Sequence, residues 1–158
     1  MDDIAQRILS AFDRLGRVSL TAEALLAFLG PDSPQSRAVV LDALPELMNA
    51  ALLRDDGAGS YSRTEDGRLA VAPPRAITMY TRARCHLCDE AKSAIAPLAA
   101  EFGATLREVD IDADPVLRER YTNEVPVIFL GPRFFAKYRV DATRLRQALQ
   151  NAARSQSP

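Results

Sequence analysis

Apolar residues recur at helical spacing over residues 1–15. The positions that share one face are Ile4, Ile8, Leu9, Phe12 and Leu15. This spacing is that of an amphipathic helix. Gly16 follows the last of these residues, and glycine readily adopts the left-handed conformation that ends many helices. The pattern therefore predicts a first helix that ends at Gly16, followed by a short extended segment at 17–20.

Two further helices are predicted before the chain reaches residue 54. Thr21 is a suitable N-cap for a helix over 22–29, because its hydroxyl can accept a hydrogen bond from a free amide of the first turn. Ser33, which is followed by proline, marks the start of a third helix over 33–53. Pro45 lies inside that helix and should kink or split it, because proline lacks the amide donor.

The second half of the chain alternates β-forming and amphipathic runs. Strands are predicted at 76–81, 104–111, 125–130 and 134–140, and helices at 85–103, 114–123 and 141–155. Gly131-Pro132 is a turn between the last two strands. The order β-α-β-α-β-β-α predicts a small mixed α/β sheet with helices on its faces.

Pro73 and Pro74 separate the two halves, because consecutive prolines interrupt regular structure. The predicted organisation is an N-terminal domain at 1–72, a linker at 73–75, a C-terminal domain at 76–152 and a flexible tail at 153–158.

Composition and charge narrow the classes of function. Of the 158 residues, 47% are hydrophobic and 26% are charged, and the net charge is −1. This balance is typical of a globular protein and gives no bulk attraction to nucleic acid or to a membrane surface. The acidic, amphipathic start is unlike a signal peptide, and no apolar run reaches the ~20 residues of a membrane span. We therefore expect a cytoplasmic protein with no membrane partner.

The N-terminal order of helix, short strand, helix, helix and hairpin is that of a winged helix, a small α+β domain. Glycines between short runs predict the hairpin at 54–71. The stretch LPELMNAALLRDDGAGSYSRTEDGRLAV, residues 44–71, resembles the third helix and wing of winged-helix regulators, in which "LL" followed by "Y-x-x-T-x-x-G-R" recurs.

The commonest activity of that family is DNA binding, but the charges here argue against it. Residues 1–74 contain seven arginines, no lysine and eleven Asp or Glu residues, a net charge of −4. Phosphate neutralisation needs clustered positive charge, and only the wing arginines Arg54, Arg63 and Arg68 leave a DNA role open. We favour a module that docks a protein partner or dimerises.

The chemistry is concentrated in TRARCHLCDEAK, residues 81–92, which holds both cysteines and the single histidine. Cys85 lies where a predicted strand meets a predicted helix, so free amides and the helix dipole favour its thiolate. Arg84 and His86 can add positive charge and tune that thiolate. Cys88 lies about one turn further on the same face, within reach of Cys85 but more buried. This arrangement predicts that Cys85 attacks a disulfide and Cys88 resolves the product.

Two other interpretations of the cysteine pair stay open. The cysteines could be small apolar residues packed on a helix face. A metal site usually requires four ligands, and Cys85, His86 and Cys88 supply only three without a second subunit. We therefore predict no metal site in one chain. A C-x-x-C pair at the start of a β-α unit in a cytosolic protein favours redox chemistry.

Residues 76–150 are predicted to hold a strand, then CxxC at the start of a helix, then VP before the third strand. This order resembles the glutaredoxins of the thioredoxin superfamily. More narrowly, CHLCDEAK, VDID and EVPVIFL look like a bacterial glutaredoxin-like family. The resemblance implies a redox-active disulfide in which Cys85 and Cys88 are the catalytic pair.

The resemblance also implies residues that bind substrate. Pro126 matches the proline that glutaredoxins hold in a cis peptide bond beside the sulfurs, and only X-Pro bonds make cis inexpensive. Such a bond would turn the backbone of Val125 towards a bound substrate, to pair with it as an added strand. Arg82 stands where glutaredoxins often carry a lysine, three residues before the nucleophile.

The region before the last helix departs from the glutaredoxin pattern. Glutaredoxins usually have a Gly-Gly step and then an acidic residue there, where the amino end of glutathione is held. In this chain Tyr138 and Arg139 replace the glycines, and Asp141 is the acidic residue. Side chains at these positions make a close backbone approach less favourable. We expect no tightly bound cofactor, and the electron donor is left open between glutathione and a reductase.

The sequence therefore predicts a thiol–disulfide oxidoreductase. Its expected partner is a disulfide-bearing protein or a low-molecular-weight thiol, and its N-terminal domain could bind a further protein. The alternative is a redox-responsive regulator, in which the thiol state controls what the winged-helix-like domain binds.

Overall fold

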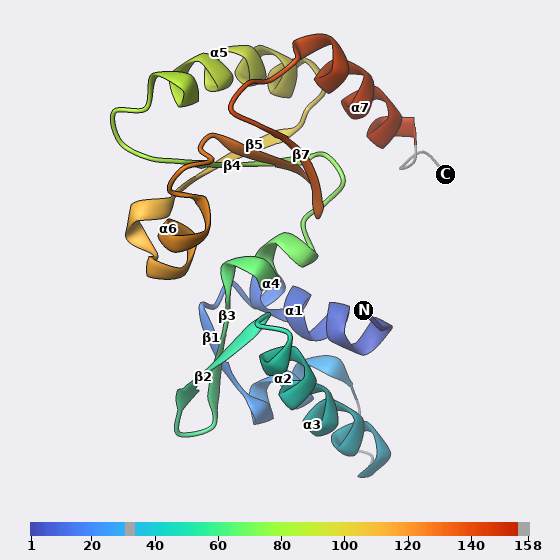
Figure 1. The fold of residues 1–158 in the computed structure, drawn as a ribbon. Coiled ribbons are helices and arrows are strands. Elements are labelled where there is room, and N and C mark those ends of the chain that lie inside the picture. Colours follow the sequence, from blue (N-terminus) through green and yellow to red (C-terminus); the bar gives the residue numbers. More distant parts are fainter. Residues whose placement is uncertain (31–33, 155–158) are drawn as a thin grey trace. The chain divides into compact units, whose positions relative to one another are not determined.

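The computed structural model of the protein describes residues 1–30 and 34–154, with 34–36 described by their main chain alone. The chain divides into two compact units, Met1–Val71 and Ala72–Pro158 (Figure 1). Each unit has a hydrophobic core of its own.

The first unit combines four helices with a small antiparallel sheet. Its elements are α1 (Asp3–Leu15), β1 (Ser19–Thr21), α2 (Ala22–Leu29), α3 (Pro34–Asn49), β2 (Leu53–Gly57), β3 (Ser60–Arg63) and α4 (Glu65–Ala70). The strand order is β1-β3-β2, with both pairs antiparallel. The predicted order of helix, strand, helix, helix and hairpin is therefore present. Membership of the winged-helix family stays a prediction.

The predicted caps of α1 and α2 are confirmed. Gly16 ends α1 in the left-handed conformation, with φ of 62°. The Thr21 hydroxyl accepts a hydrogen bond from the amide of Ala24 at 3.1 Å and so begins α2. These local interactions depend on residues close in sequence, which is why the sequence alone identified them.

The third helix differs from its prediction in two respects. Helix α3 passes through Pro45 unbroken, and Pro45 is exposed, so the carbonyl that loses its partner can be hydrated. The helix ends at Asn49 rather than at 53, because Ala51 takes a positive φ of 56° and Leu53 pairs with Arg63 in the sheet. The predicted start at Ser33 lies outside the described residues.

The hairpin predicted at 54–71 is shorter than expected, because its last part forms α4. The Thr64 hydroxyl accepts a hydrogen bond from the amide of Gly67 at 3.1 Å and begins this helix. Gly67 packs closely, since a Cβ atom there would lie 2.1 Å from the carbonyl oxygen of Leu52. The residues Thr64 to Gly67 were included in the predicted hairpin, whereas the threonine is the N-cap of a helix.

The second unit is a four-stranded mixed sheet with helices on both faces. Its elements are β4 (Ala76–Thr81), α5 (His86–Glu101), β5 (Thr105–Asp110), the 3-10 helix η1 (Ile111–Ala113), α6 (Pro115–Tyr121), β6 (Val127–Leu130), β7 (Arg133–Lys137) and α7 (Ala142–Arg154). The strand order is β5-β4-β6-β7, in which β4 and β5 are parallel and the other pairs are antiparallel. Helices α5 and α7 cover one face and α6 the other (Figure 1). The predicted mixed α/β order is confirmed, with η1 as an addition.

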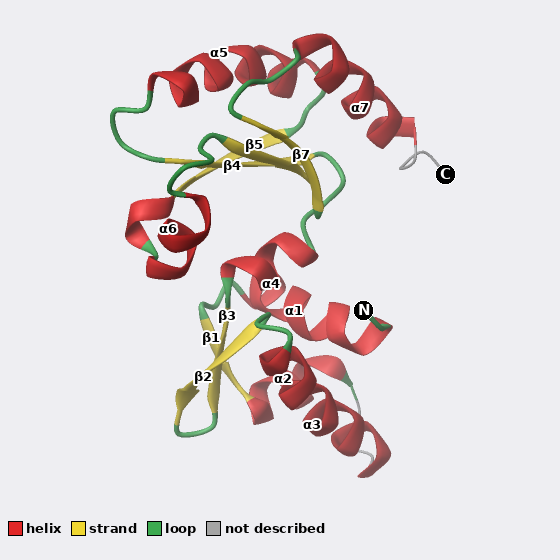
Figure 2. Cartoon of the chain, in the orientation of Figure 1, coloured by secondary structure: helices red, strands yellow, loops and turns green. Residues whose placement is uncertain are grey.

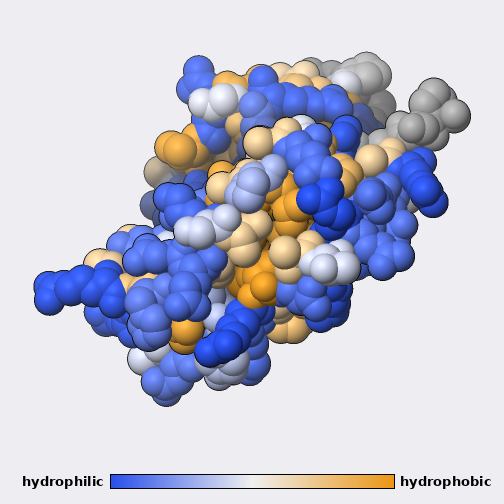
Figure 3. Space-filling model, turned by 90° about the horizontal axis from the view of Figure 1, so that it is seen from above, coloured by the Kyte–Doolittle hydropathy of each residue, from blue (hydrophilic) through white to orange (hydrophobic). Residues whose placement is uncertain are grey.

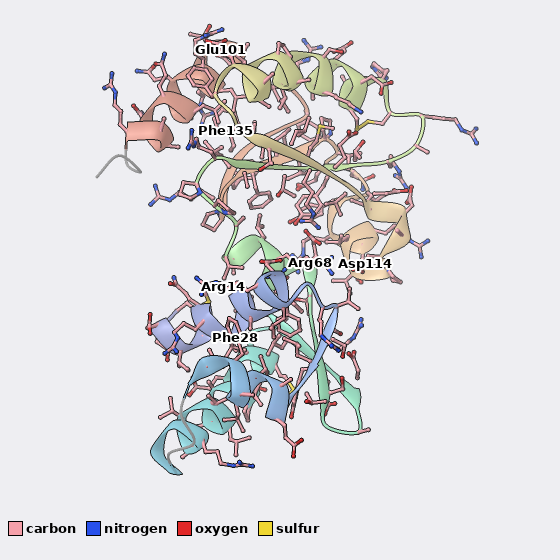
Figure 4. All side chains as sticks on the ribbon, turned by 180° about the vertical axis from the view of Figure 1, so that it is seen from behind. Arg14, Phe28, Arg68, Glu101, Asp114 and Phe135 are labelled. Atoms are coloured by element: carbon pink, nitrogen blue, oxygen red, sulfur yellow. A yellow bond between two sulfur atoms is a disulfide. The ribbon has the colours of Figure 1, made fainter. Side chains whose placement is uncertain are left out.

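Two clusters of buried residues hold these layers together. One lies under α5 and α7 and includes Ile95, Ile128 and Leu145, all fully buried; Phe135 of β7 belongs to it (Figure 4). The other lies under α6, where the rings of Tyr80 and Tyr121 stack with their centroids 4.8 Å apart. The sheet is therefore packed on both faces, which fixes where its strand ends lie.

Several boundaries of this unit differ from the predicted ones. The unit begins at Ala72, and within the segment 73–75, predicted as a linker, the carbonyl oxygen of Pro73 accepts a hydrogen bond from the amide of Ala76 at 2.8 Å. The strand predicted at 134–140 ends at Lys137, because the next residue takes a positive φ of 66°. Helix α7 includes residues 153 and 154 of the predicted tail, and the rest of that tail lies outside the described residues.

Among the described residues, no helix combines the length and the hydrophobicity needed to cross a membrane. Hydrophilic residues occupy most of the face seen in Figure 3, with a band of hydrophobic residues between them.

Candidate active site

The fold places Cys85 at the point where β4 passes into α5. Strand β4 ends at Thr81, a short loop follows (Figure 2), and α5 begins at His86 with Cys85 as its N-cap. Arg84 takes a positive φ of 57° in this loop. The predicted position of Cys85, at a strand-to-helix junction, is confirmed.

The two cysteines form a disulfide. Their Cα atoms are 5.2 Å apart, as expected for residues one helical turn apart. The Sγ atom of Cys85 also accepts a hydrogen bond from the amide of Cys88 at 3.2 Å. Cys85 is half-buried, whereas Cys88 is only 3% exposed. An approaching molecule therefore reaches the sulfur of Cys85 before that of Cys88.

Arg82 forms an ion pair beside the loop. Its Nη2 and Nε atoms donate to the two carboxylate oxygens of Asp112 at 2.6 and 3.1 Å, and Nη1 donates to the carbonyl oxygen of Thr122 at 3.3 Å. The hydrogen bond that Arg82 donates to Asp112 raises the pKa of Arg82. The sequence did not single out Asp112, because it is 30 residues away in η1.

Arg84 and His86, the predicted thiolate-tuning residues, lie on either side of Cys85 with exposed side chains. Among the described residues, neither side chain has a hydrogen bond or ion pair. The guanidinium of Arg84 and the imidazole of His86 are therefore available to an approaching molecule.

The segment before β6 reaches the same end of the sheet. The β4–β6 ladder ends at the pair Tyr80–Val127, so Val125 and Pro126 lie beyond it, beside the carboxyl end of β4. The Val125–Pro126 peptide bond is cis. Pro126 is buried and Val125 half-buried. The carbonyl oxygen of Pro126 accepts a hydrogen bond from the amide of Tyr138 at 2.8 Å, which holds the end of β7 against this segment.

A second ion pair lies next to this segment, and sequence reasoning missed it. The ammonium group of Lys137 is 2.7 Å from a carboxylate oxygen of Glu124, and this hydrogen bond raises the pKa of Lys137. The same ammonium group lies 5.3 Å from the ring centroid of Tyr138, whose side chain is 42% exposed. Asp141 accepts a hydrogen bond from the amide of Arg144 at 3.0 Å and so begins α7.

No group of three or more His, Cys, Asp or Glu side chains with metal-site geometry occurs in the described part of the chain.

Comparisons with known proteins agree with this geometry. Residues 76–150 match the family model described as "Glutaredoxin-like domain (DUF836)". A glutaredoxin-like protein of Dictyostelium discoideum is 33% identical over 86 residues, covering 51% of this chain and 80% of that protein. The chain belongs to the glutaredoxin-like family. The family domain begins at Ala76, the first residue of β4, and contains both cysteines.

Other similar proteins come from bacteria. An uncharacterized protein of Mycobacterium tuberculosis is 31% identical over 75 residues, covering 44% of this chain and 77% of that protein. A solved structure from X. campestris is 38% identical, with a TM-score of 0.40, and covers 48% of this chain and 96% of its own. Another solved structure, from Nitrosomonas europaea, is 28% identical, with a TM-score of 0.41. It covers 46% of this chain and 87% of its own.

The wing arginines of the first unit all have acidic partners. Arg63 donates to Asp13 at 2.5 and 2.7 Å, and its side chain is only 8% exposed. Arg54 lies 3.1 Å from Asp56, and Arg68 (Figure 4) lies 3.7 Å from Glu65. These ion pairs reduce the positive charge that the wing presents.

Proposed function

We propose that the glutaredoxin-like domain carries out thiol–disulfide exchange through Cys85 and Cys88. The observation that supports this most directly is the disulfide between a half-buried cysteine at a helix N-terminus and a buried cysteine one turn later. The first position favours a thiolate and gives access to another disulfide, and the second protects the resolving thiol.

In the first step, the thiolate of reduced Cys85 attacks one sulfur of a client disulfide. A mixed disulfide forms between Cys85 and the client, and the other client sulfur leaves as a thiolate. The amide of Cys88, which contacts the Cys85 sulfur, and the dipole of α5 stabilise the attacking thiolate. The exposed Arg84 and His86 add positive charge around it.

In the second step, Cys88 loses its proton and attacks the Cys85 sulfur. The Cys85–Cys88 disulfide forms, and the second client sulfur leaves as a thiolate that takes up the proton released by Cys88. The client thiolate released in the first step takes up a proton from water, so the client has gained two electrons and two protons, and the protein is in the oxidised state of the structure. An external thiol such as glutathione, or a dithiol reductase, returns the pair to its reduced form by the same exchange.

Val125 and Pro126 are proposed to receive the client. They lie beyond the β4–β6 ladder at the end of the sheet where β4 passes towards Cys85. An extended client segment can add to a strand end by main-chain hydrogen bonds, which require no particular client sequence.

The test is equilibration of the pair in dithiothreitol redox buffers, with thiols trapped and counted by mass spectrometry. A reversible two-electron couple is expected, together with reduction of a peptide disulfide. Cys88→Ser should accumulate a mixed disulfide on Cys85, because nothing resolves it. Absence of exchange by the wild-type protein, with the pair fully reduced at the start, would overturn the proposal.

We also propose that the first unit docks a protein partner rather than DNA. Its net negative charge and the acid-paired wing arginines support this, because DNA binding depends on clustered positive charge. The expected result is no salt-dependent retention of the full chain on duplex DNA in either redox state. Redox-dependent DNA binding would instead favour the regulator.

A further inference from the structure

Positive charge is concentrated in the last part of the chain. Residues 131–154 contain six Lys or Arg residues and one aspartate, a net charge of +5, whereas the whole chain carries −1. These residues form β7 and α7, which lie against each other, since the guanidinium carbon of Arg144 is 4.9 Å from the ring centroid of Phe135. Strand β7 and helix α7 therefore form a basic surface on the second unit.

Three arginines of this surface are not neutralised by the protein itself. Within the described ranges 1–30 and 34–154, the exposed side chains of Arg133, Arg139 and Arg144 form no ion pair with a carboxylate. Lys137 and Arg146, in contrast, are paired with acidic side chains of this chain. An unpaired guanidinium presents a fork of N–H donors that matches a carboxylate. The surface is therefore complementary to an acidic partner.

A groove lies beside these arginines. Its volume is about 540 Å³, which falls within the usual range of ligand pockets, ~300–1,000 Å³. Arg133 contributes to its wall, and the apolar residues that line it come from the β6–β7 hairpin and α7: Leu130, Pro132, Phe134, Phe135 and Ala148. The groove therefore combines apolar walls with an unpaired positive charge.

Phe134 is a feature of the groove that the basic charge does not explain. Basic residues on an edge strand discourage pairing with another chain, but an exposed phenylalanine has the opposite effect. The side chain is 57% exposed, although its ring packs edge to face against Phe129 with the centroids 5.9 Å apart. A large aromatic ring that is held in place and exposed is typical of residues that become buried when a partner binds.

Strand β7 also offers main-chain groups to a partner. It is an edge strand that pairs with β6 on one side, and no strand pairs with its other side in the described part of the sheet. Arg133, Phe134 and Phe135 follow one another along β7, and all three line the groove. The groove therefore follows the strand edge, where a polypeptide can form main-chain hydrogen bonds.

We infer that this groove is a docking site for an acidic polypeptide segment that carries a large apolar side chain. The apolar side chain fills the groove beside Phe134, and neighbouring carboxylates pair with Arg133 and the other unpaired arginines. The same surface of a second copy fits less well, because it would bring like charges together. A nucleic acid also fits less well, because the apolar walls offer no partner to a phosphate.

The groove is remote from the disulfide. The amide of Gly131 donates to the carbonyl oxygen of Ala76 at 2.7 Å, which places the β6–β7 turn at the start of β4. Cys85 follows the other end of β4, which has six residues, so the two ends of this strand are about 16 Å apart. A docked segment therefore leaves Cys85 accessible, and the inference does not rest on the proposed exchange function.

The experiment measures fluorescence anisotropy of a short, fluorescein-labelled peptide with blocked ends, in which glutamate and serine alternate around a central phenylalanine. One control peptide has lysine in place of each glutamate, and another has serine in place of the phenylalanine. The full-length chain is titrated into each, in its oxidised and in its reduced state. The peptides contain no cysteine, so thiol exchange does not contribute to the signal.

The acidic peptide with phenylalanine should bind at least about fivefold more tightly than either control peptide, in both redox states. Phe134→Ser should weaken its binding by about fivefold or more. Arg133→Gln should weaken it by about two- to fivefold, as expected for one exposed ion pair, and added salt should remove this difference. The matched controls are Val116→Ser and Arg118→Gln, which change exposed residues of the same kinds on α6 and should leave the affinity unchanged.

Circular dichroism of each variant establishes that it is folded. The inference is overturned if the acidic peptide binds no more tightly than the lysine peptide, or if the folded Phe134→Ser and Arg133→Gln variants both bind it like the wild type. It is also overturned if the acidic peptide shows no binding at about 1 mM, or if a single-stranded oligodeoxythymidine binds more tightly. Failure of the proposed exchange function would leave all these affinities unchanged.

Discussion

Helices α2 and α5 begin in the same way, although they belong to different units. The hydroxyl of Thr21 accepts a hydrogen bond from the amide of Ala24 at 3.1 Å, and the sulfur of Cys85 accepts one from the amide of Cys88 at 3.2 Å. An oxygen in this position satisfies a free amide and does nothing more. A sulfur there is also stabilised as a thiolate. One capping geometry thus serves stability in the first unit and, under the proposed function, thiolate chemistry in the second.

Substituting Cys85 by serine separates the two roles and should have the largest effect. Serine keeps an acceptor at the N-cap, but it cannot form a disulfide. Exchange with a peptide disulfide should fall to the uncatalysed rate, while urea unfolding of the reduced protein should change by less than about 0.5 kcal/mol. Substantial exchange by this variant would mean that Cys88 attacks substrates directly.

Cys85→Ala removes the acceptor as well as the sulfur. The reduced variant should be less stable than reduced Cys85→Ser by about 1 kcal/mol, the usual contribution of an N-cap side chain. Urea unfolding of the second unit measures the difference. Equal stability of the alanine and serine variants would show that the side chain at 85 does not cap α5.

Thr21→Ala tests the same cap in the first unit. It should lower the free energy of unfolding of that unit by about 1 kcal/mol, while Thr21→Ser, the matched control, should lower it by only a few tenths. The redox equilibrium of Cys85 and Cys88 should not change in either variant. A shift in that equilibrium would reveal coupling between the two units.

Asp112→Asn should have the smallest effect on stability, below that of either cap substitution, because the ion pair with Arg82 is partly exposed. The pKa of Arg82 is raised by this partner. The ion pair therefore contributes fully to stability at any pH below the ordinary pKa of arginine, and this contribution is lost only as the pH rises through the raised pKa. The difference between wild type and variant in urea midpoint should therefore be the same at pH 7 and pH 9. A difference that disappears at pH 9 would contradict this assignment.

The parts of the site that depend on neighbours in sequence could be predicted, and those that depend on the folded sheet could not. The position of Cys85 at a helix start and its spacing from Cys88 follow from the local pattern. Asp112 and Glu124 come from segments 30 and 13 residues away from the cations they bind, and no local pattern indicates such pairs.

The same distinction applies to the fold. Most helices and strands follow from hydrophobic periodicity and capping residues, including the closing α7. Helix α4 was missed because its short run was interpreted as the end of a hairpin, although Thr64 carries an N-cap. The end of β7 was misplaced because Tyr138 takes a positive φ where its amide donates to Pro126, a tertiary contact that no local pattern indicates.

That positive φ has a consequence for engineering. A residue with a side chain in the left-handed conformation costs roughly 1 kcal/mol relative to glycine, so Tyr138→Gly is a simple route to a more stable protein. The same substitution would delete the exposed ring of a residue whose amide is hydrogen-bonded to Pro126. Under the proposed function, in which Val125 and Pro126 receive the client, selection for thermal robustness and selection for client capture would therefore choose different amino acids at position 138.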